Sequence, residues 1–107
     1  MANRIGSFTK TVATSGTQLQ LSTTVGKVNT VIVQALRTNT GYVAVGDSTA
    51  DYATMIGVQL GEPTTGSTPA SVVFSSSREG SNEVDLSDIW VDVEVNGEGV
   101  SVTWTRA

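Results

Sequence analysis

The chain has 107 residues, a net charge of -4 at neutral pH, and neither cysteine nor histidine. This composition excludes disulfides, thiolate catalysis, zinc sites built on cysteine or histidine, and every mechanism that needs a histidine base. The few, scattered basic residues argue against contact with nucleic acid or an anionic membrane surface, and no apolar run is long enough to span a membrane. We expect a single soluble domain that is not an enzyme.

Charged residues make up only 15% of the chain, so the polar surface must consist mainly of serine and threonine. Valine and threonine are each much commoner than leucine, and β-branched side chains suit a pleated strand better than a helix. Apolar and polar residues alternate along most of the sequence. These features predict an all-β fold: a single-domain antiparallel β-sandwich or barrel of about seven to nine short strands.

The first candidate strands are residues 5–12 and 17–22, separated by a stretch rich in turn residues. We treat residues 1–27 as N-terminal strands or an arm that can contact a partner or another subunit. Residues 28–107 are then the sandwich core, with one domain overall.

Residues 28–37 form the most apolar segment, which predicts a central strand covered on both faces. Residues 38–41 are predicted to make a turn in which Gly41 is suited to positive φ. Residues 42–47 are predicted to return beside the preceding strand as its partner.

The segment 48–53 is compatible either with one helical turn capped by Ser48 or with a loop. Residues 55–60 predict a weaker strand because a glycine interrupts the pattern. Residues 61–71 contain both prolines and few apolar side chains, which predicts a long surface loop. A short strand is expected at 71–75 and a polar loop at 76–82.

The clearest strand pattern lies at residues 89–95 and 100–104, where valines alternate with polar residues. Asn96-Gly97 between them is a strong signal for a two-residue hairpin. This hairpin would place Val93 opposite Val100, with every apolar pair on one face.

The opposite face of residues 89–95 carries Asp92 and Glu94. Their spacing is compatible with the carboxylate pair of a glycosidase, but a chain of this size with six aromatic residues offers little material for a sugar-cleaving cleft. We therefore interpret the two acids as part of a solvated outer face. No catalytic residue is predicted.

Glu83, Asp85 and Asp88 gather oxygen ligands within eight residues, as some calcium loops do, but their spacing is not that of an EF-hand. The simpler prediction is a tight turn in which Asp85 and Ser87 bond local backbone N–H groups. We predict no metal site and no cofactor.

The aromatic residues divide into core and contact candidates. Trp104 shares the valine face and is predicted to be a core residue. Trp90 shares the face of the two acids, where either a loop or second sheet covers it or it contacts a partner. The candidate partner contacts are Trp90, Tyr52, Pro63, Pro69 and Phe8.

Three blocks of sequence occur in an order that resembles a known group. They are VIVQALRTNTGYVAVGDS, the Gly-Val-x-Leu-Gly-Glu stretch at 57–62, and DLSDIWVDVEVNGEGVSVTW. Together they resemble small bacteriophage virion structural proteins of the capsid decoration or cement type. The resemblance covers residues 28 to 104, apart from 61–82, and does not include residues 1–27.

The resemblance implies a protein that binds and stabilises the lattice of the major capsid protein. It also implies a homo-oligomer, most often a trimer, located on the capsid surface and soluble in the host cytoplasm before assembly. We expect residues 1–27 and the loop 61–71 to make the contacts, because both are polar and show little core pattern; the alternative is that both are plain solvent-exposed chain. The alternative is a head-fibre, tail or baseplate component that binds a host receptor or surface glycan, with Trp90 and Tyr52 stacking on the sugar.

Overall fold

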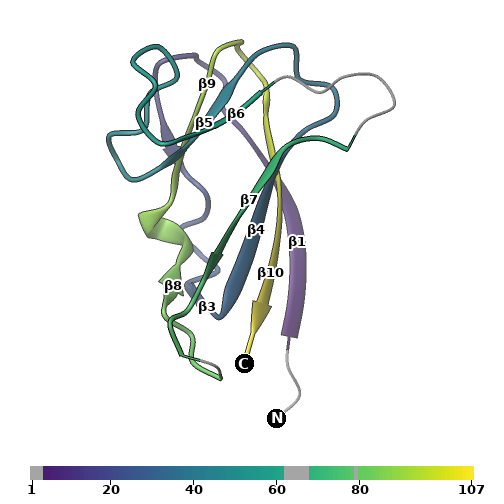
Figure 1. The fold of residues 1–107 in the computed structure, drawn as a ribbon, viewed down its shortest axis with the longest axis vertical. Coiled ribbons are helices and arrows are strands. Elements are labelled where there is room, and N and C mark those ends of the chain that lie inside the picture. Colours follow the sequence, from purple (N-terminus) through teal and green to yellow (C-terminus); the bar gives the residue numbers. More distant parts are fainter. Residues whose placement is uncertain (1–3, 62–67, 79) are drawn as a thin grey trace.

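The computed structural model describes residues 4–61, 68–78 and 80–107. Two four-stranded antiparallel sheets pack face to face, and a two-stranded ribbon lies beside them (Figure 1). The prediction of an all-β fold of short antiparallel strands is therefore confirmed. The described residues contain one short 3-10 turn and no helix that is long and apolar enough to cross a membrane.

The sheets are named here by their strands. Sheet A has the order β1 (Arg4–Thr11), β10 (Gly99–Arg106), β4 (Thr30–Ala35) and β7 (Ser71–Ser75). Sheet B has the order β2 (Leu19–Gln20), β9 (Trp90–Val93), β5 (Val43–Gly46) and β6 (Val58–Leu60). The ribbon pairs β3 (Lys27–Val28) with β8 (Val84–Asp85), which leads into the 3-10 turn η1 (Leu86–Asp88).

The core lies between the two sheets and consists mainly of valine. Alternate residues of each strand point inward because side chains on a strand change face at every step. The buried residues of the core are Val12, Leu21, Val28, Val31, Val33, Ala35, Val43, Val45, Leu60, Leu86, Ile89, Val91, Val93, Val100 and Val102. Trp104 and Phe8 are half-buried and pack against this core. The prediction that Trp104 lies on the core face is therefore confirmed.

The strand predicted at 28–37 is central in its sheet, as expected, because β4 lies between β10 and β7. The prediction that it is covered on both faces is wrong. Val31 and Val33 are fully buried, whereas Ile32 between them is 41% exposed. Among the described residues, the second sheet lies against one side of sheet A only.

The predicted hairpin between residues 89–95 and 100–104 is also wrong. β9 belongs to sheet B and β10 to sheet A, so their valines face one another across the core instead of lying side by side. A type I′ turn needs positive φ at both central residues, but of Asn96 and Gly97 only Gly97 has it, at 84°. The Gly97 N–H donates to the carbonyl of Val12 at 2.8 Å, and Asn96 Oδ1 accepts from the N–H of Ser15 at 2.7 Å.

Residues 38–41 likewise cross between the sheets, so 42–47 does not return beside β4. β5 pairs with β9 and β6 instead. Gly41 does not adopt positive φ. A Cβ at this position would lie 2.8 Å from Glu94 Oε1 and 3.0 Å from Glu94 Cβ and Val95 Cγ2, so these side chains would have to shift to accept it. The crossing is held by Glu98, whose carboxylate accepts from the N–H groups of Thr40 at 2.6 Å and Gly41 at 3.1 Å.

Of the surface loop expected at 61–71, residues 62–67 lie outside the described part of the chain. Residues 48–53 form turns, not a helical turn capped by Ser48, and Asp47 Oδ1 accepts from the Thr49 N–H at 2.9 Å. β6 is shorter than the predicted strand at 55–60. β7 has the predicted bounds.

Candidate functional site

The outer side of sheet A carries no charged residue across its strand pairs. Strand register places the outward-facing side chains in three rows of four, which we call the sheet-A face. Directly opposed residues on neighbouring strands share a face. The rows are Ile5–Thr105–Thr30–Ser75, Ser7–Thr103–Ile32–Val73 and Thr9–Ser101–Gln34–Ser71.

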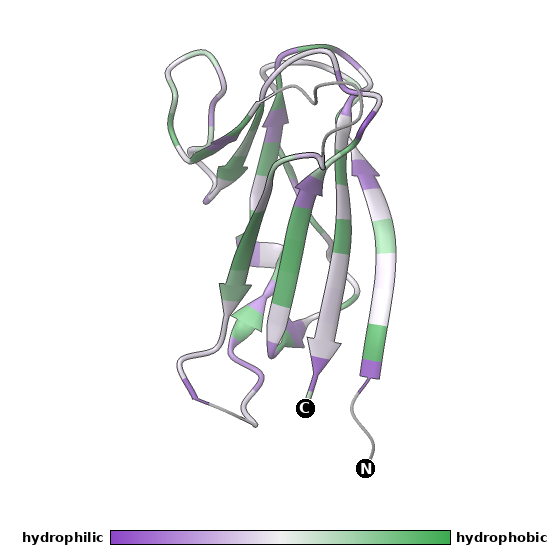
Figure 2. Ribbon diagram, turned by 45° about the vertical axis from the view of Figure 1, so that its right-hand side comes forward, coloured by the Kyte–Doolittle hydropathy of each residue, from purple (hydrophilic) through white to green (hydrophobic). Residues whose placement is uncertain are grey.

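Two of the three aliphatic side chains of the sheet-A face lie side by side in its middle row, Ile32 on the inner strand β4 and Val73 on the edge strand β7. Ile32 is 41% exposed and its neighbour Val73 is 55% exposed. The surrounding hydroxyls are weakly engaged with one another, as in the 3.4 Å pair between Ser7 Oγ and Thr103 Oγ1. In Figure 2 the hydrophilic colour on β1 is confined to its two ends. The face therefore combines apolar contact area with neutral hydrogen-bonding groups.

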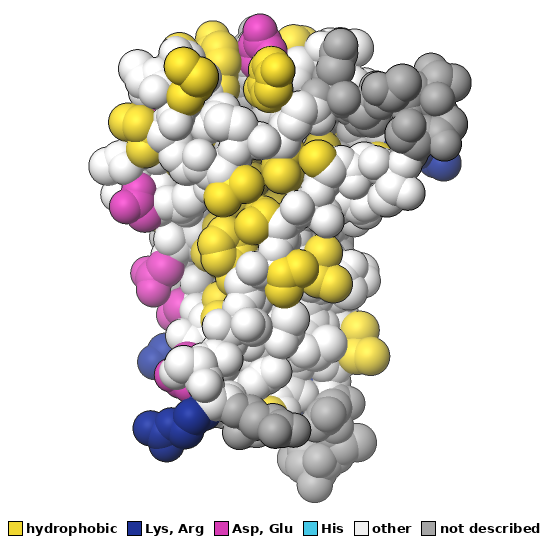
Figure 3. Space-filling view, in the orientation of Figure 1, with side chains coloured by type: hydrophobic (Ala, Val, Ile, Leu, Met, Phe, Trp, Pro, Cys, Tyr) yellow, Lys and Arg dark blue, Asp and Glu magenta, His cyan; other side chains and the backbone are white. Residues whose placement is uncertain are grey.

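β7 adds apolar surface at one margin of sheet A. Figure 3 shows hydrophobic side chains in a diagonal band that follows the course of β7, with acidic side chains at the left margin of the view. β7 contributes exposed Val73 and half-buried Val72 and Phe74.

β1 is an edge strand of sheet A. The N–H of Val12 donates to the carbonyl of Glu98 at 2.9 Å. By strand alternation, the backbone groups of odd-numbered β1 residues then point away from β10, toward the edge. No described strand pairs there. β1 contains no proline and no bulge, two features that commonly protect a sheet edge against pairing. Beyond the first residue of the strand, Lys10 on the inner side is its one charge and its one protective feature of this kind.

The predicted contact residues fall in different places. Phe8 lies on the inner side of β1 and packs against the core. Pro69 is half-buried, and its carbonyl accepts from Gln34 Nε2 at 3.2 Å. Pro63 lies outside the described residues. A contact role for these three residues stays a prediction.

The acid face of β9 is covered more than the sequence indicated. Asp92 is 1% exposed, so the expected solvated pair is wrong for Asp92, although Glu94 is exposed. The reason is the loop after β5, which folds back over sheet B. Asp92 accepts hydrogen bonds from the N–H groups of Gly16 at 2.9 Å, Tyr52 at 3.1 Å and Val93 at 2.9 Å. Trp90, on the same face, is half-buried.

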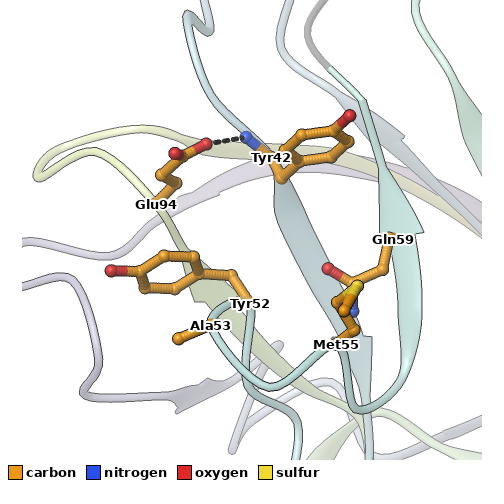
Figure 4. A pocket seen from close by; sticks show the side chains of 6 residues that line it. All are labelled: Tyr42, Tyr52, Ala53, Met55, Gln59 and Glu94. Atoms are coloured by element: carbon orange, nitrogen blue, oxygen red, sulfur yellow. Dashed lines mark hydrogen bonds between the residues drawn. The ribbon is translucent and has the colours of Figure 1, made fainter.

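That loop helps to form a half-open pocket with a volume of about 410 Å³. Its lining residues are Tyr42, Tyr52, Ala53, Met55, Gln59 and Glu94, shown in Figure 4. Tyr42 precedes β5, Tyr52 and Met55 come from the loop, and Gln59 lies on β6. Of the residues singled out from the sequence as contacts, Tyr52 lines this pocket and Trp90 does not.

Sequence reasoning missed Tyr42, Met55 and Gln59. Tyr42 is 53% exposed, although the strand pattern next to it is apolar. Met55 has a φ of 60°, which is unusual for a residue other than glycine. The usable signal was the pair of tyrosines flanking a turn-rich segment, but the pairing of β5 with β6 had to be known to bring Gln59 to them.

The acids at 81–88 do not converge. Glu83 accepts from Ser77 Oγ at 3.1 Å, whereas Asp85 Oδ1 accepts from the N–H and Oγ of Ser87 at 2.9 and 2.7 Å. The predicted local turn is therefore confirmed for Asp85. The Ser87 hydroxyl and then its N–H hold the pKa of Asp85 below its ordinary value. In the described part of the chain, no group of acids is arranged to hold a metal ion.

Comparison of the chain with protein families, with curated proteins and with solved structures found no match.

Proposed function

We propose that this chain is a bacteriophage capsid decoration protein that binds and stabilises the lattice of the major capsid protein. The observation that carries the proposal is the sheet-A face, an uncharged surface of serine, threonine and aliphatic side chains bordered by the open edge of β1. The order of sequence blocks described above supports the same assignment.

The chemistry of this surface suits assembly. An interface core is depleted in charged residues, because burying a charge without a partner is costly. The sheet-A face offers Ile32 and Val73 for such a core and neutral hydroxyls for its rim. The edge of β1 can add main-chain hydrogen bonds to a strand of the partner.

A virion presents many identical sites, and a decoration protein can exploit that repetition. If copies of this chain associate, most simply as a trimer, each copy needs only a modest affinity for the lattice. The set binds tightly because the second and third contacts are intramolecular.

The test is co-sedimentation of the purified protein with phage capsids stripped of it. We expect saturable binding at a fixed ratio to the capsid protein, and greater resistance of the capsids to heat. Ile32→Glu places a charge at the centre of the sheet-A face and should abolish binding. Thr23→Glu adds the same charge at an exposed position away from sheet A, and should bind as the unaltered protein does.

Two outcomes would contradict the proposal. The first is a folded protein that ignores capsids at saturating concentration. The second is equal binding by the Ile32→Glu and Thr23→Glu variants, which would remove the sheet-A face as the contact. Light scattering on the same samples would report the oligomeric state.

A further inference from the structure

The pocket between Tyr42 and Tyr52 lies on the side of sheet B, away from the sheet-A face, and the assembly role does not use it. Its volume of about 410 Å³ falls in the range of small-ligand sites, about 300–1,000 Å³. Figure 4 shows the two phenol rings, Gln59 and Met55 arranged around one hollow.

The pocket is held in shape by the backbone. The N–H of Tyr42 donates to Glu94 Oε1 at 3.0 Å, and the N–H of Glu94 donates to the carbonyl of Tyr42 at 3.0 Å. On the other wall, the N–H of Tyr52 donates to buried Asp92 at 3.1 Å. Both aromatic residues are thus fixed through their main chains, which lowers the entropy lost when a ligand binds.

The turn that carries Tyr52 is itself closed by a small bridge. Asp51 and Ile56 exchange backbone hydrogen bonds of 3.1 and 3.0 Å. Met55 within this turn has a φ of 60°, a left-handed conformation that costs a non-glycine residue free energy. The Met55 side chain is exposed and lines the pocket.

The polar groups of the pocket are mainly acceptors. Glu94 Oε1 is occupied by the N–H of Tyr42, whereas Oε2 has no hydrogen bond within the described chain. Gln59 Nε2 donates to the carbonyls of Ile56 and Gly57 at 3.3 and 3.4 Å. The amide oxygen Oε1 therefore points away from these two carbonyls. The two phenols can donate or accept.

The lining residues include no lysine or arginine. A phosphate, sulfate or carboxylate ligand would meet the charge of Glu94 without compensation. An aliphatic peptide side chain would cover Glu94 and Gln59 and leave their acceptors without partners, which is unfavourable. A ligand with many neutral hydroxyl donors and apolar C–H faces meets neither difficulty.

We propose that this pocket binds a neutral pyranose unit of a glycan. The C–H face of the sugar packs on Tyr42 and Tyr52, and its hydroxyls donate to Glu94 Oε2 and Gln59 Oε1. This inference goes beyond the capsid-binding role and does not depend on it.

The experiment records two-dimensional amide NMR spectra of the protein during titration with methyl β-D-glucopyranoside, methyl β-D-galactopyranoside, N-acetylglucosamine and N-acetylneuraminic acid. We expect saturable shifts at the amides of Tyr52, Ala53 and Gln59 with at least one neutral sugar. The charged N-acetylneuraminic acid should produce none.

Variants then show whether a loss of sugar binding comes from the pocket itself or from unfolding of the protein. Tyr42→Ala and Tyr52→Ala should each weaken sugar binding about tenfold or more through loss of stacking, whereas Tyr42→Phe keeps the ring and should bind nearly as well. Thr54→Ala, an exposed position in the same turn that does not line the pocket, is the matched control.

The proposal fails if no neutral sugar shifts the pocket amides. It also fails if Tyr42→Ala and Tyr52→Ala, with spectra of folded proteins, bind as tightly as the Thr54→Ala control. Saturable shifts with an apolar peptide but not with any sugar would reassign the pocket to a protein partner. Capsid binding by the same variants should be unchanged, so this test and that of the assembly role fail independently.

Discussion

The carboxylate of Asp92 accepts a hydrogen bond from the N–H of Tyr52 at 3.1 Å, which ties the loop after β5 to β9, an inner strand of sheet B. The same carboxylate accepts from Gly16 and Val93. One buried side chain therefore fixes two loops that meet over this sheet.

Removing that carboxylate should be costly. Asp92→Ala leaves three backbone N–H groups without their acceptor, and we expect the free energy of unfolding to fall by about 3 kcal/mol. Thermal unfolding should show a midpoint lower by more than 10 °C, at about 4–8 °C for each kcal/mol. Asp88→Ala, at an exposed acid, is the control and should change little. Equal melting of the two variants would mean that Asp92 does not anchor the loops.

Gly99 is required for β1 to approach β10. A Cβ at this position would collide with the carbonyl oxygen of Lys10 and lie 2.7 Å from the Cα of Thr11. Gly99→Ala should therefore destabilise the protein by about 2–3 kcal/mol and speed hydrogen exchange at the amide of Phe8. Gly16→Ala has open space around it and a φ of 86°, so it should cost only about 1–2 kcal/mol for the left-handed conformation. Intact protection of β1 in Gly99→Ala would contradict this account.

Substitution by threonine should have different effects at two neighbouring residues of β4. Val33 is fully buried and Ile32 is exposed. Val33→Thr buries a hydroxyl in an apolar core and should cost about 1–3 kcal/mol, whereas Ile32→Thr should stay within about 0.5 kcal/mol of the unaltered protein. Urea unfolding measures both. A large loss of stability in Ile32→Thr would show that a further layer covers the sheet-A face.

The Asp85 carboxyl, at the turn that begins η1, should titrate at low pH. The Ser87 hydroxyl first and its N–H second hold the pKa of Asp85 below its ordinary value. Because the folded pKa is depressed, this contribution to stability is complete above the unfolded pKa and is lost as the pH falls through the folded pKa. Carboxyl NMR titration should show a midpoint for Asp85 below that of an ordinary aspartate, and Ser87→Ala should raise it. The pKa of Asp47, which Thr49 lowers in the same way, should not move. A shift of both midpoints, or of neither, would contradict the local cause.

Alternation predicted which residues are buried but not which strands are neighbours. Val91, Val93, Val100 and Val102 all point into the core, as expected. A hairpin and a crossing between sheets both satisfy that pattern, because each places the two valine stripes on the inner side. The choice depends on contacts distant in sequence, here those of Asn96 with Ser15 and Gly97 with Val12.

Burial of the acid face also depended on distant sequence. Alternation places Asp92 outward from the core, which is correct, but the loop after β5 then covers it. Tyr52 was recognisable as an aromatic residue in a turn-rich segment, whereas its neighbours in the pocket come from strands whose pairing the sequence left open. Local chemistry, as in the turn of Asp85 and Ser87, was predictable because all its partners lie within three residues.

The pairing of β1 with β10 also limits the order in which the strands of sheet A can fold together. Arg4 meets Arg106, and β10 is the strand that joins β1 to the rest of sheet A. During synthesis, residues 4–11 therefore have no partner until residues 99–106 have left the ribosome. β1 therefore cannot join sheet A before β10 has been made, and a contact between segments so distant in sequence forms slowly. In the nascent chain, residues 4–11 would stay unpaired, and accessible to chaperones, until then.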